Sequence, residues 1–292
     1  MSDPYVRGRD LSKSFGGKTV LEDLSFEVEP GDVIGVLGKN GAGKTTLLEL
    51  MLGFTPPSAG SVEILGHESY RLPAAIKSRI GFVPQQDELV NQLRASDQLR
   101  VIRAFYDHWD DGLIERLMAS WEIDPNQRIK GMSVGQRQKL SILLALGHRP
   151  DLLLLDEPVA GLDPLARRRF LEQIVEIAAD GKRSVVFSSH IVSDIERLAS
   201  KIWILKDNRL HWRGDFDALK ESIVRVHLRS PRPISAPWTI PNALAVDYEE
   251  SFATAIVRDW TEELRREIAE LTGAEVEPEP LTLEDIFLEL HR

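Results

Sequence analysis

Short, mainly apolar runs alternate along this chain with segments of helical periodicity. The runs at 33–37, 152–155 and 184–188 predict strands buried on both faces, as in a parallel sheet. Leucine and methionine recur on one face of residues 45–52, which predicts a helix directly after the first run. A second helix is expected over residues 164–179. Strands that alternate with helices predict an α/β fold with a mainly parallel sheet.

Three other segments of the same region have weaker patterns. Residues 21–28 alternate apolar and polar side chains, which predicts a strand buried on one face. Residues 92–123 are rich in charge and helical in pattern, with aromatic side chains interspersed. Residues 202–205 and 210–212 predict a hairpin that closes around Asp207 and Asn208.

The composition changes near residue 220. Pro231, Pro233, Pro237 and Pro241 crowd into a short stretch, which is typical of a loop. Three strand-like runs and one helical segment surround this stretch, at 223–228, 244–248, 254–257 and 261–271. We therefore predict two domains, a large one over residues 1–220 and a small α+β domain over residues 221–292.

Composition and charge narrow the classes of function. The 292 residues include 36 basic and 46 acidic side chains, which gives a net charge of −10. A chain of this charge is a poor non-specific binder of nucleic acid or of an anionic membrane surface. The chain has no cysteine, so disulfides, thiolate metal sites and cysteine nucleophiles are excluded.

No segment of the sequence predicts a membrane span. The longest uncharged stretch of helical character covers residues 140–147, whereas a spanning helix needs roughly 20 apolar residues. The first ten residues are polar and mixed in charge, unlike a secretory signal. If the protein moves a substrate across a membrane, we expect the channel to belong to another chain.

A glycine-rich loop follows the first apolar run and fits the pattern G-x-x-x-x-G-K-[ST]. Glycine lets the backbone wrap closely around phosphate, and the next helix presents its positive N-terminus to the same anion. We expect Lys44 to reach the β- and γ-phosphates of a nucleotide and Thr45 to bind Mg²⁺ through its hydroxyl. The predicted loop comprises Gly38, Lys39, Asn40, Gly41, Ala42, Gly43, Lys44, Thr45 and Thr46.

Two adjacent acids end the apolar run at 152–155. Asp156 is expected to bind Mg²⁺, directly or through water, and Glu157 to polarise the water that attacks the γ-phosphate. Adjacent acids after a strand are often only a solvated turn. The phosphate loop upstream favours the catalytic interpretation.

A third motif makes the resemblance specific. Residues Met132, Ser133, Val134, Gly135 and Gln136 resemble the L-S-G-G-Q signature of the ATP-binding cassette (ABC) family. In that family, the signature serine and glycine form a second cradle for the γ-phosphate, which closes onto ATP held by the opposite subunit. The resemblance therefore implies that Ser133, Gly135 and Gln136 contact nucleotide and that the protein acts as a dimer.

Four more residues match family elements in family order. Gln85 resembles the glutamine that senses Mg²⁺ and the attacking water. Asp163, in the sequence Ala-Gly-Leu-Asp, resembles the aspartate at the dimer seam, and His190 resembles the histidine that contacts the γ-phosphate. Phe15 occupies the position of an aromatic residue that stacks on adenine, although it could equally belong to the core.

The resemblance covers roughly residues 5–220 and implies a P-loop NTPase fold with a helical subdomain at about 86–150. Residues 281–290 resemble the C-terminal ending of ATPases from ABC-2-type exporters, with an ordinary amphipathic helix as the alternative.

Three positions depart from the family pattern. Val134 replaces a glycine, so the signature loop must reach its phosphate without left-handed geometry at that residue. Lys39 replaces the usual proline and either adds charge near the nucleotide or points into solvent. Val159 stands where threonine is common.

The resemblance implies an ATP-hydrolysing subunit, using ATP and Mg²⁺, that drives an exporter. Closure of a homodimer or heterodimer would power separate membrane-spanning permease subunits from the cytoplasmic face of the membrane. One alternative is a soluble cassette ATPase that acts on ribosomes or nucleic acid. The single ATPase unit and the acidic charge oppose that alternative, and no binding to nucleic acid is expected. Another is a non-hydrolysing partner in a heterodimer, which the intact Lys44, Asp156, Glu157 and His190 oppose.

Overall fold

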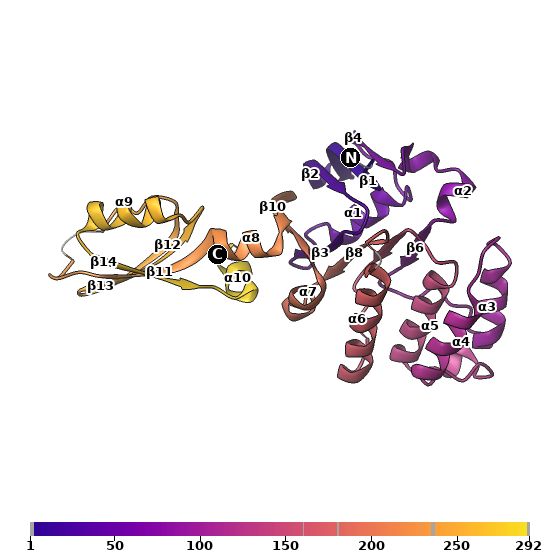
Figure 1. The fold of residues 1–292 in the computed structure, drawn as a ribbon. Helices are drawn as coiled ribbons and strands as arrows, with labels where there is room; N and C mark the ends of the chain where they lie inside the picture. The colour runs from indigo at the N-terminus through magenta and orange to yellow at the C-terminus, as the bar shows by residue number, and fades with distance from the viewer. Residues whose placement is uncertain (1–2, 160, 180, 235–236, 291–292) are drawn as a thin grey trace. The chain divides into compact units, whose positions relative to one another are not determined.

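The computed structural model describes residues 3–159, 161–179, 181–234 and 237–290. The chain divides into two compact units, Met1–Arg213 and Gly214–Arg292, called here the first and second units (Figure 1). The strand β10 (Arg209–Asp215) runs across the division, and the helix α8 (Phe216–Ser222) begins the second unit. The second unit therefore begins before α8, whereas the change in composition near residue 220 suggests a start after it. The helix belongs to the second unit because it packs on the strand that follows it, and its Leu219 is buried.

A six-stranded sheet forms the centre of the first unit, and its strands are ordered β10-β9-β3-β8-β7-β6. The pairs formed among β3, β6, β7, β8 and β9 are parallel, as the alternation of strands and helices predicts. Strands β9 and β10 form the predicted hairpin, with Asp207 and Asn208 at positive φ. The other strands are β3 (Val33–Gly38), β6 (Ile80–Val83), β7 (Leu152–Leu155), β8 (Ser184–Ser189) and β9 (Lys201–Lys206).

A second sheet of the first unit is antiparallel and ordered β2-β1-β4-β5. Its strands are β1 (Val6–Phe15), β2 (Lys18–Val28), β4 (Ala59–Ile64) and β5 (His67–Glu68). Only the part of β2 at 21–28 is predicted from the sequence. The others mix polar and apolar residues because one face of this sheet is exposed, and several register shifts interrupt the pairing of β1.

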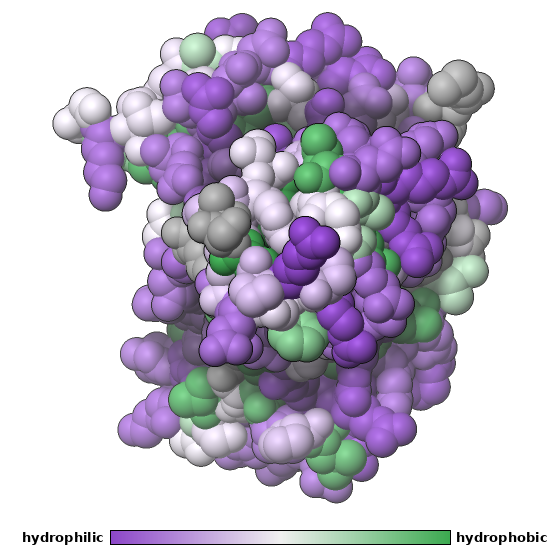
Figure 2. All heavy atoms as spheres, turned by 90° about the vertical axis from the view of Figure 1, so that its left-hand side faces the viewer, coloured by the Kyte–Doolittle hydropathy of each residue, from purple (hydrophilic) through white to green (hydrophobic). Residues whose placement is uncertain are grey.

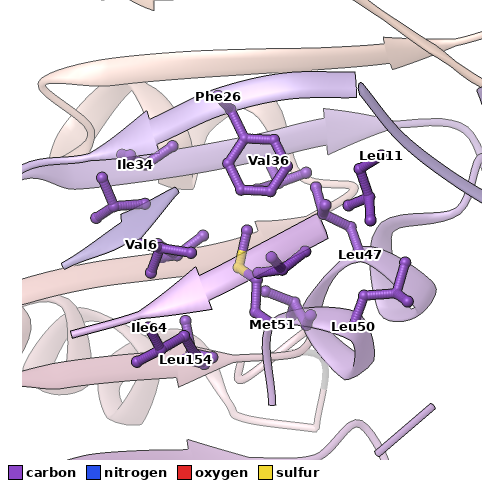
Figure 3. Packing of buried hydrophobic residues seen from close by; sticks show 14 of the residues in the cluster. Val6, Leu11, Phe26, Ile34, Val36, Leu47, Leu50, Met51, Ile64 and Leu154 are labelled. Carbon is purple, nitrogen blue, oxygen red and sulfur yellow. The ribbon is translucent and has the colours of Figure 1, made fainter. Parts of the chain in front are cut away.

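The helix α1 (Lys44–Met51) packs against strands of both sheets. Its leucine and methionine side chains join those of β1, β2, β3, β4 and β7 in one buried cluster (Figure 3). Leu47, Leu48 and Met51 of the predicted face are buried, and Leu50 is buried as well, because α1 has sheet on more than one side. The start of α1, which follows the glycine-rich loop, is therefore held firmly by the core.

Three helices of the first unit gather beside the central sheet (Figure 1), and two of them, α3 and α4, lie within residues 92–123, where the charged pattern predicts helix. They are α3 (Ala95–Arg103), α4 (Asp111–Ser120) and α5 (Val134–Leu146). The helices α6 (Pro164–Ala178) and α7 (Val192–Leu198) pack on β8, and α7 also lies against Gly35 of β3. The remaining short elements are α2 (Ala74–Lys77) and the 3-10 turns Ser69–Arg71 and Ile129–Gly131.

The second unit is an antiparallel sheet with helices, ordered β12-β13-β11-β14. Its elements are β11 (Ile223–Arg229), β12 (Ala243–Glu249), β13 (Phe252–Arg258), α9 (Glu262–Thr272), β14 (Glu275–Pro280) and α10 (Leu283–Leu290). The strand β14 is not predicted from the sequence because it contains Pro278 and Pro280. It lies at an edge of the sheet, where proline is tolerated.

The surface of the protein is largely hydrophilic on the face drawn in Figure 2. Hydrophobic residues are scattered over that face and do not gather in one large patch. Among the described residues, no helix is both long enough and apolar enough to cross a bilayer.

Replacing Phe26 with alanine should destabilise the first unit strongly. The Phe26 side chain is 1% exposed, its ring lies 4.9 Å from that of Trp203, and it fills the space over Gly8. We expect Phe26→Ala to lower the free energy of unfolding by about 3–5 kcal/mol in urea denaturation. The control is Phe105→Ala, at a ring that is 78% exposed, which should change it by no more than about 0.5 kcal/mol.

Ending the chain after Asp215 should leave the first unit folded. This cut keeps β10 whole and removes α8 and the elements after it, which belong to the second unit. We expect the shortened protein to unfold cooperatively and to bind a fluorescent ATP analogue as tightly as the full chain. Loss of nucleotide binding in a folded, shortened protein would contradict the prediction that the first unit alone binds the nucleotide.

Candidate functional site

The carboxyl ends of four neighbouring strands meet at one edge of the central sheet. Strands β6, β7, β8 and β3 are paired in parallel register, so the residues that follow them lie side by side. Gln85 follows β6, Asp156 and Glu157 follow β7, and His190 follows β8. The phosphate loop begins at Gly38, the last residue of β3. This edge is where open α/β sheets bind ligands.

The phosphate loop depends on glycine at specific positions. Gly41 has a φ of 81° and Gly43 a φ of 101°, and side chains rarely adopt this left-handed backbone. A Cβ atom at Gly43 would also lie 2.6 Å from the Leu21 side chain. The Lys39 side chain is exposed, and the Ala42 amide donates to its carbonyl at 3.1 Å, which closes the loop.

Lys44, Glu157 and His190 form one connected cluster. The Lys44 ammonium donates to the Gly38 carbonyl at 2.8 Å and lies 3.5 Å from Glu157 Oε1. The other carboxylate oxygen of Glu157 lies 2.7 Å from His190 Nδ1. The Lys44 and Glu157 side chains are each 7% exposed, whereas that of His190 is 50% exposed. A buried cation and a buried carboxylate therefore face each other, with the imidazole covering them from the solvent side.

Ser188 organises the two acids and is a functional residue that the sequence analysis misses. Its hydroxyl donates to Asp156 Oδ1 at 2.6 Å and accepts from the Glu157 amide at 2.8 Å. Ser188 is wholly buried. Glu157 adopts a φ of 48°, a left-handed backbone that costs a non-glycine residue free energy and is common at functional sites. The signal in the sequence is a pair of serines, Ser188 and Ser189, at the carboxyl end of β8, directly before His190.

The oxygen atoms near the loop fit a magnesium ion that arrives with a nucleotide. Asp156 has a 1% exposed carboxylate held by Ser188, and Thr45 offers a hydroxyl at the exposed start of α1. Among the described residues, no group of three or more histidine, aspartate or glutamate side chains converges as a metal cage. Mg²⁺ is usually bound by one or two protein oxygens together with phosphate and water, so this donor set suits it.

The signature segment lies at the start of α5. Ser133 caps this helix: its hydroxyl accepts from the Gln136 amide at 3.2 Å, and its own amide donates to Gln136 Oε1 at 2.9 Å. Val134 is the first helical residue and is 70% exposed, so a valine fits here without left-handed geometry. Gln136 also exchanges hydrogen bonds with Gln127. The Gln136 side chain therefore supports the loop from within its own chain.

The segment before α6 lies against the signature segment. Ala160 falls outside the described residues, but a Cβ atom at Gly161 would lie 2.8 Å from Val134 Cγ1. Asp163 caps α6 by accepting from the Leu165 amide at 3.0 Å and the Ala166 amide at 2.9 Å. The Ala166 hydrogen bond is the main cause of a lowered pKa at Asp163, which keeps its carboxylate charged.

Phe15 and Gln85 lie at the surface. The Phe15 ring is 48% exposed and therefore not part of the core, and the Lys13 ammonium lies 4.6 Å from its centroid. Lys13 is fixed by hydrogen bonds to Thr55 Oγ1 at 2.6 Å and to the Pro56 carbonyl at 2.7 Å. Gln85 is exposed just beyond β6. Both side chains are accessible to a ligand.

Known proteins resemble this chain over most of its length. Residues 21–160 match the family model described as ABC transporter. The chain is 30% identical over 280 residues to the ABC transporter ATP-binding protein YtrB of Bacillus subtilis, covering 96% of each chain. It is 31% identical over 291 residues to the Nod factor export ATP-binding protein I of Rhizobium johnstonii, covering 96% of this chain and 92% of that one.

Solved structures share the fold of the first unit. A structure described as the ATP binding subunit of an ABC transporter matches with a TM-score of 0.68 and 28% identity, over 74% of this chain and 92% of that one. An ATP-binding cassette bound to ADP and Pi matches with a TM-score of 0.65 and 21% identity, over 72% of this chain and 98% of that one. These likenesses confirm the α/β fold class expected from the sequence.

Replacing Ser188 with alanine should slow ATP hydrolysis. The change leaves Asp156 Oδ1 and the Glu157 amide without the buried hydroxyl that positions them. We expect kcat to fall between about 10- and 100-fold, because small errors in positioning carry such costs, with little change in KM.

The matched control is Ser184→Ala, at the other end of β8. The Ser184 hydroxyl accepts from the Gly31 amide at 3.0 Å and donates to the Glu29 carbonyl at 2.8 Å, away from the acids. Its loss should cost about 1–3 kcal/mol of stability and leave kcat unchanged. Equal kcat in the two variants would contradict the role of Ser188.

Proposed function

The chain belongs to the ABC transporter ATP-binding proteins and is an ATPase, and we propose that it powers an exporter as one half of an ATP-closed dimer. The observation that carries this proposal is the separation of two phosphate-binding elements. Lys44, Glu157 and His190 form one cluster at the sheet edge, whereas Ser133 and Gly135 lie on α5. A second copy, or a related chain, supplies the missing element to each site.

Lys44 changes partners in the proposed reaction. Its ammonium faces the single negative charge of Glu157 at 3.5 Å, and a triphosphate in the loop offers far more negative charge. Lys44 therefore moves towards the β- and γ-phosphates, which the loop amides also bind. The Glu157 carboxylate is then released from its ion pair and can accept a hydrogen bond from water.

Glu157 and His190 act on the attacking water. Water oxygen forms a bond to the γ-phosphorus while the bond to the oxygen of the leaving ADP breaks, and Glu157 accepts the proton of the water. His190 Nδ1, at 2.7 Å, holds the carboxylate in place, and the exposed side of its imidazole is available to the γ-phosphate. Gln85, beyond β6, would contact the same water.

Asp156 and Thr45 would hold Mg²⁺ when the nucleotide carries it. When bound there, it would supply positive charge against the phosphate oxygens. Gln85 is the third proposed ligand. Phe15 would stack on the adenine ring, since its side chain is exposed. The other proposed nucleotide contacts are Gly38, Lys39, Asn40, Gly41, Ala42, Gly43, Thr46, Gln136 and Asp163.

The signature segment closes the dimer in this proposal. The helix α5 presents its positive N-terminal end, capped by Ser133, and this end would suit the γ-phosphate held by the other subunit. Gly161 lies beside it, and Gly161 and Asp163 would meet the same partner. A homodimer and a heterodimer both satisfy this geometry.

Transport requires membrane-spanning permease subunits on other chains, with this protein at the cytoplasmic face of the membrane. The direction of transport is supported by similarity to a protein named for Nod factor export and by the resemblance of residues 281–290 to the ending of ATPases from ABC-2-type exporters. Binding to ribosomes or nucleic acid is opposed by the net charge of −10. The domain boundary near residue 220 and the helical subdomain at about 86–150 are part of the same proposal.

Replacing Glu157 with glutamine should trap a dimer. The amide keeps the shape of the side chain and removes the proton acceptor, so ATP binds but is not cleaved. We expect Glu157→Gln to elute as a dimer in size-exclusion chromatography with light scattering when ATP and Mg²⁺ are present. The double variant Lys44→Ala/Glu157→Gln, which loses the phosphate-binding cation, should stay monomeric. A monomer of ATP-loaded Glu157→Gln would contradict closure.

A further inference from the structure

Lys13 is a buried lysine on β1 that the proposed reaction does not use. It is 7% exposed, and its ammonium donates to Thr55 Oγ1 at 2.6 Å and to the Pro56 carbonyl at 2.7 Å. The same ammonium lies over the Phe15 ring, 4.6 Å from its centroid. Within the described ranges of the chain, no carboxylate pairs with it. A buried cation is costly unless it has partners, so two neutral oxygens and one aromatic ring offset that cost here.

The ammonium covers one face of the Phe15 ring. Lys13 and Phe15 are two residues apart on β1, so their side chains leave the strand on the same side. A cation in this position is attracted to the electron-rich face of the ring. Phe15 is nevertheless 48% exposed, so the part of the ring open to solvent comprises its edge and its opposite face.

The hairpin end that carries Phe15 is open. Gly16 and Gly17 connect β1 to β2 with φ values of 55° and 83°, as a tight two-residue turn requires. A Cβ atom at either glycine would meet nothing within 4 Å, and Phe15 is not a member of the buried cluster around α1. The contact with Lys13 therefore ties an otherwise peripheral ring to a buried, hydrogen-bonded group.

Lys13 also connects this hairpin to the loop that follows α1. Thr55 and Pro56 come four and five residues after Met51, the last residue of α1, and the helix begins at Lys44 of the phosphate loop. The ring proposed to receive the base and the helix proposed to receive the phosphates are thus linked through one ammonium.

We propose that Lys13 positions Phe15 for the base of the nucleotide, covering one face of the ring and leaving the other face to a purine. This inference rests on the proposed stacking of adenine on Phe15. The cation draws the electron density of the ring towards itself, so the opposite face repels an electron-rich purine less. Lys13 is a positioning residue in this account, because it acts on the nucleotide only through Phe15.

The simpler alternative is that Lys13 only fastens the loop after α1 to β1. A matched control exists in the same place: Ser58 Oγ accepts from the Ser14 amide at 3.0 Å and fastens the same loop to the same strand without the ammonium. A second control is the Lys220–Phe216 pair of α8, which has the same chemistry, with 5.3 Å from ammonium to ring centroid, but belongs to the second unit.

The experiment measures the binding of ADP and of inorganic pyrophosphate by isothermal titration calorimetry. Neither probe has a γ-phosphate, so hydrolysis and the proposed dimer closure do not contribute. We expect Phe15→Ala to weaken ADP binding about tenfold or more, as loss of base stacking does. Lys13→Met should weaken ADP binding about three- to tenfold, in the range of a cation–π contact. Pyrophosphate affinity should stay within about twofold in both variants, because the phosphate loop is untouched.

Three further variants separate positioning from fastening. Lys13→Arg keeps a cation that can stack on the ring and should recover part of the lost ADP affinity. In the Phe15→Ala background, Lys13→Met should weaken ADP no further, since the ring through which it acts is gone. Ser58→Ala and Lys220→Met should bind ADP as tightly as the unchanged protein. Where Lys13→Met fails to fold, Lys13→Gln, which keeps a donor without the charge, takes its place with the same expected result.

Several outcomes would overturn the role of Lys13. They are unchanged ADP affinity in folded Lys13→Met, an equal loss of ADP and pyrophosphate affinity, an equal loss of ADP affinity in Ser58→Ala, or a further loss in the double variant with Phe15→Ala. Unchanged ADP affinity in Phe15→Ala would instead overturn the proposed stacking on Phe15, and this inference with it.

Discussion

The register of four parallel strands is the constraint on which the site depends. Strands β6, β7, β8 and β3 come from distant parts of the chain, and their hydrogen bonds align the residues that follow each of them. The strands are mainly apolar and almost wholly buried, so a slip in register would cost buried contacts along the whole sheet. The packing of apolar strands thus fixes the positions of the polar residues that follow them. Ser188 completes the arrangement, because its hydroxyl bonds to the Asp156 carboxylate and to the Glu157 amide.

Charge is distributed so that the site is stable before and after it binds phosphate. Lys44 is buried beside Glu157, and the pair neutralises itself in a place where either charge alone would be costly. The Gly38 carbonyl holds the same ammonium, which limits how far Lys44 can move. The protein therefore carries a preformed cation in the loop, which reduces the reorganisation that phosphate binding requires.

Local motifs are readable from the sequence, whereas long-range polar pairing is not. The phosphate loop, the acids after β7 and the start of α5 follow from short patterns, because each needs particular residue types at fixed spacing. The antiparallel sheet of the first unit is predicted only in part, since its strands have one exposed face and irregular register. Ser188 and Lys13 leave no periodic trace: their partners Asp156 and Thr55 lie 32 and 42 residues away along the chain. Only the assembled fold brings them together.

The prolines of β14 limit how the sheet of the second unit can grow. Pro278 and Pro280 lack amide protons, so this edge strand cannot donate at those positions to any neighbour. Unprotected edges are templates for strand addition and hence for aggregation. The opposite edge, β12, contains no proline and keeps its donors. Recruitment of a foreign strand, whether in fibril formation or by a designed peptide, would therefore begin at β12.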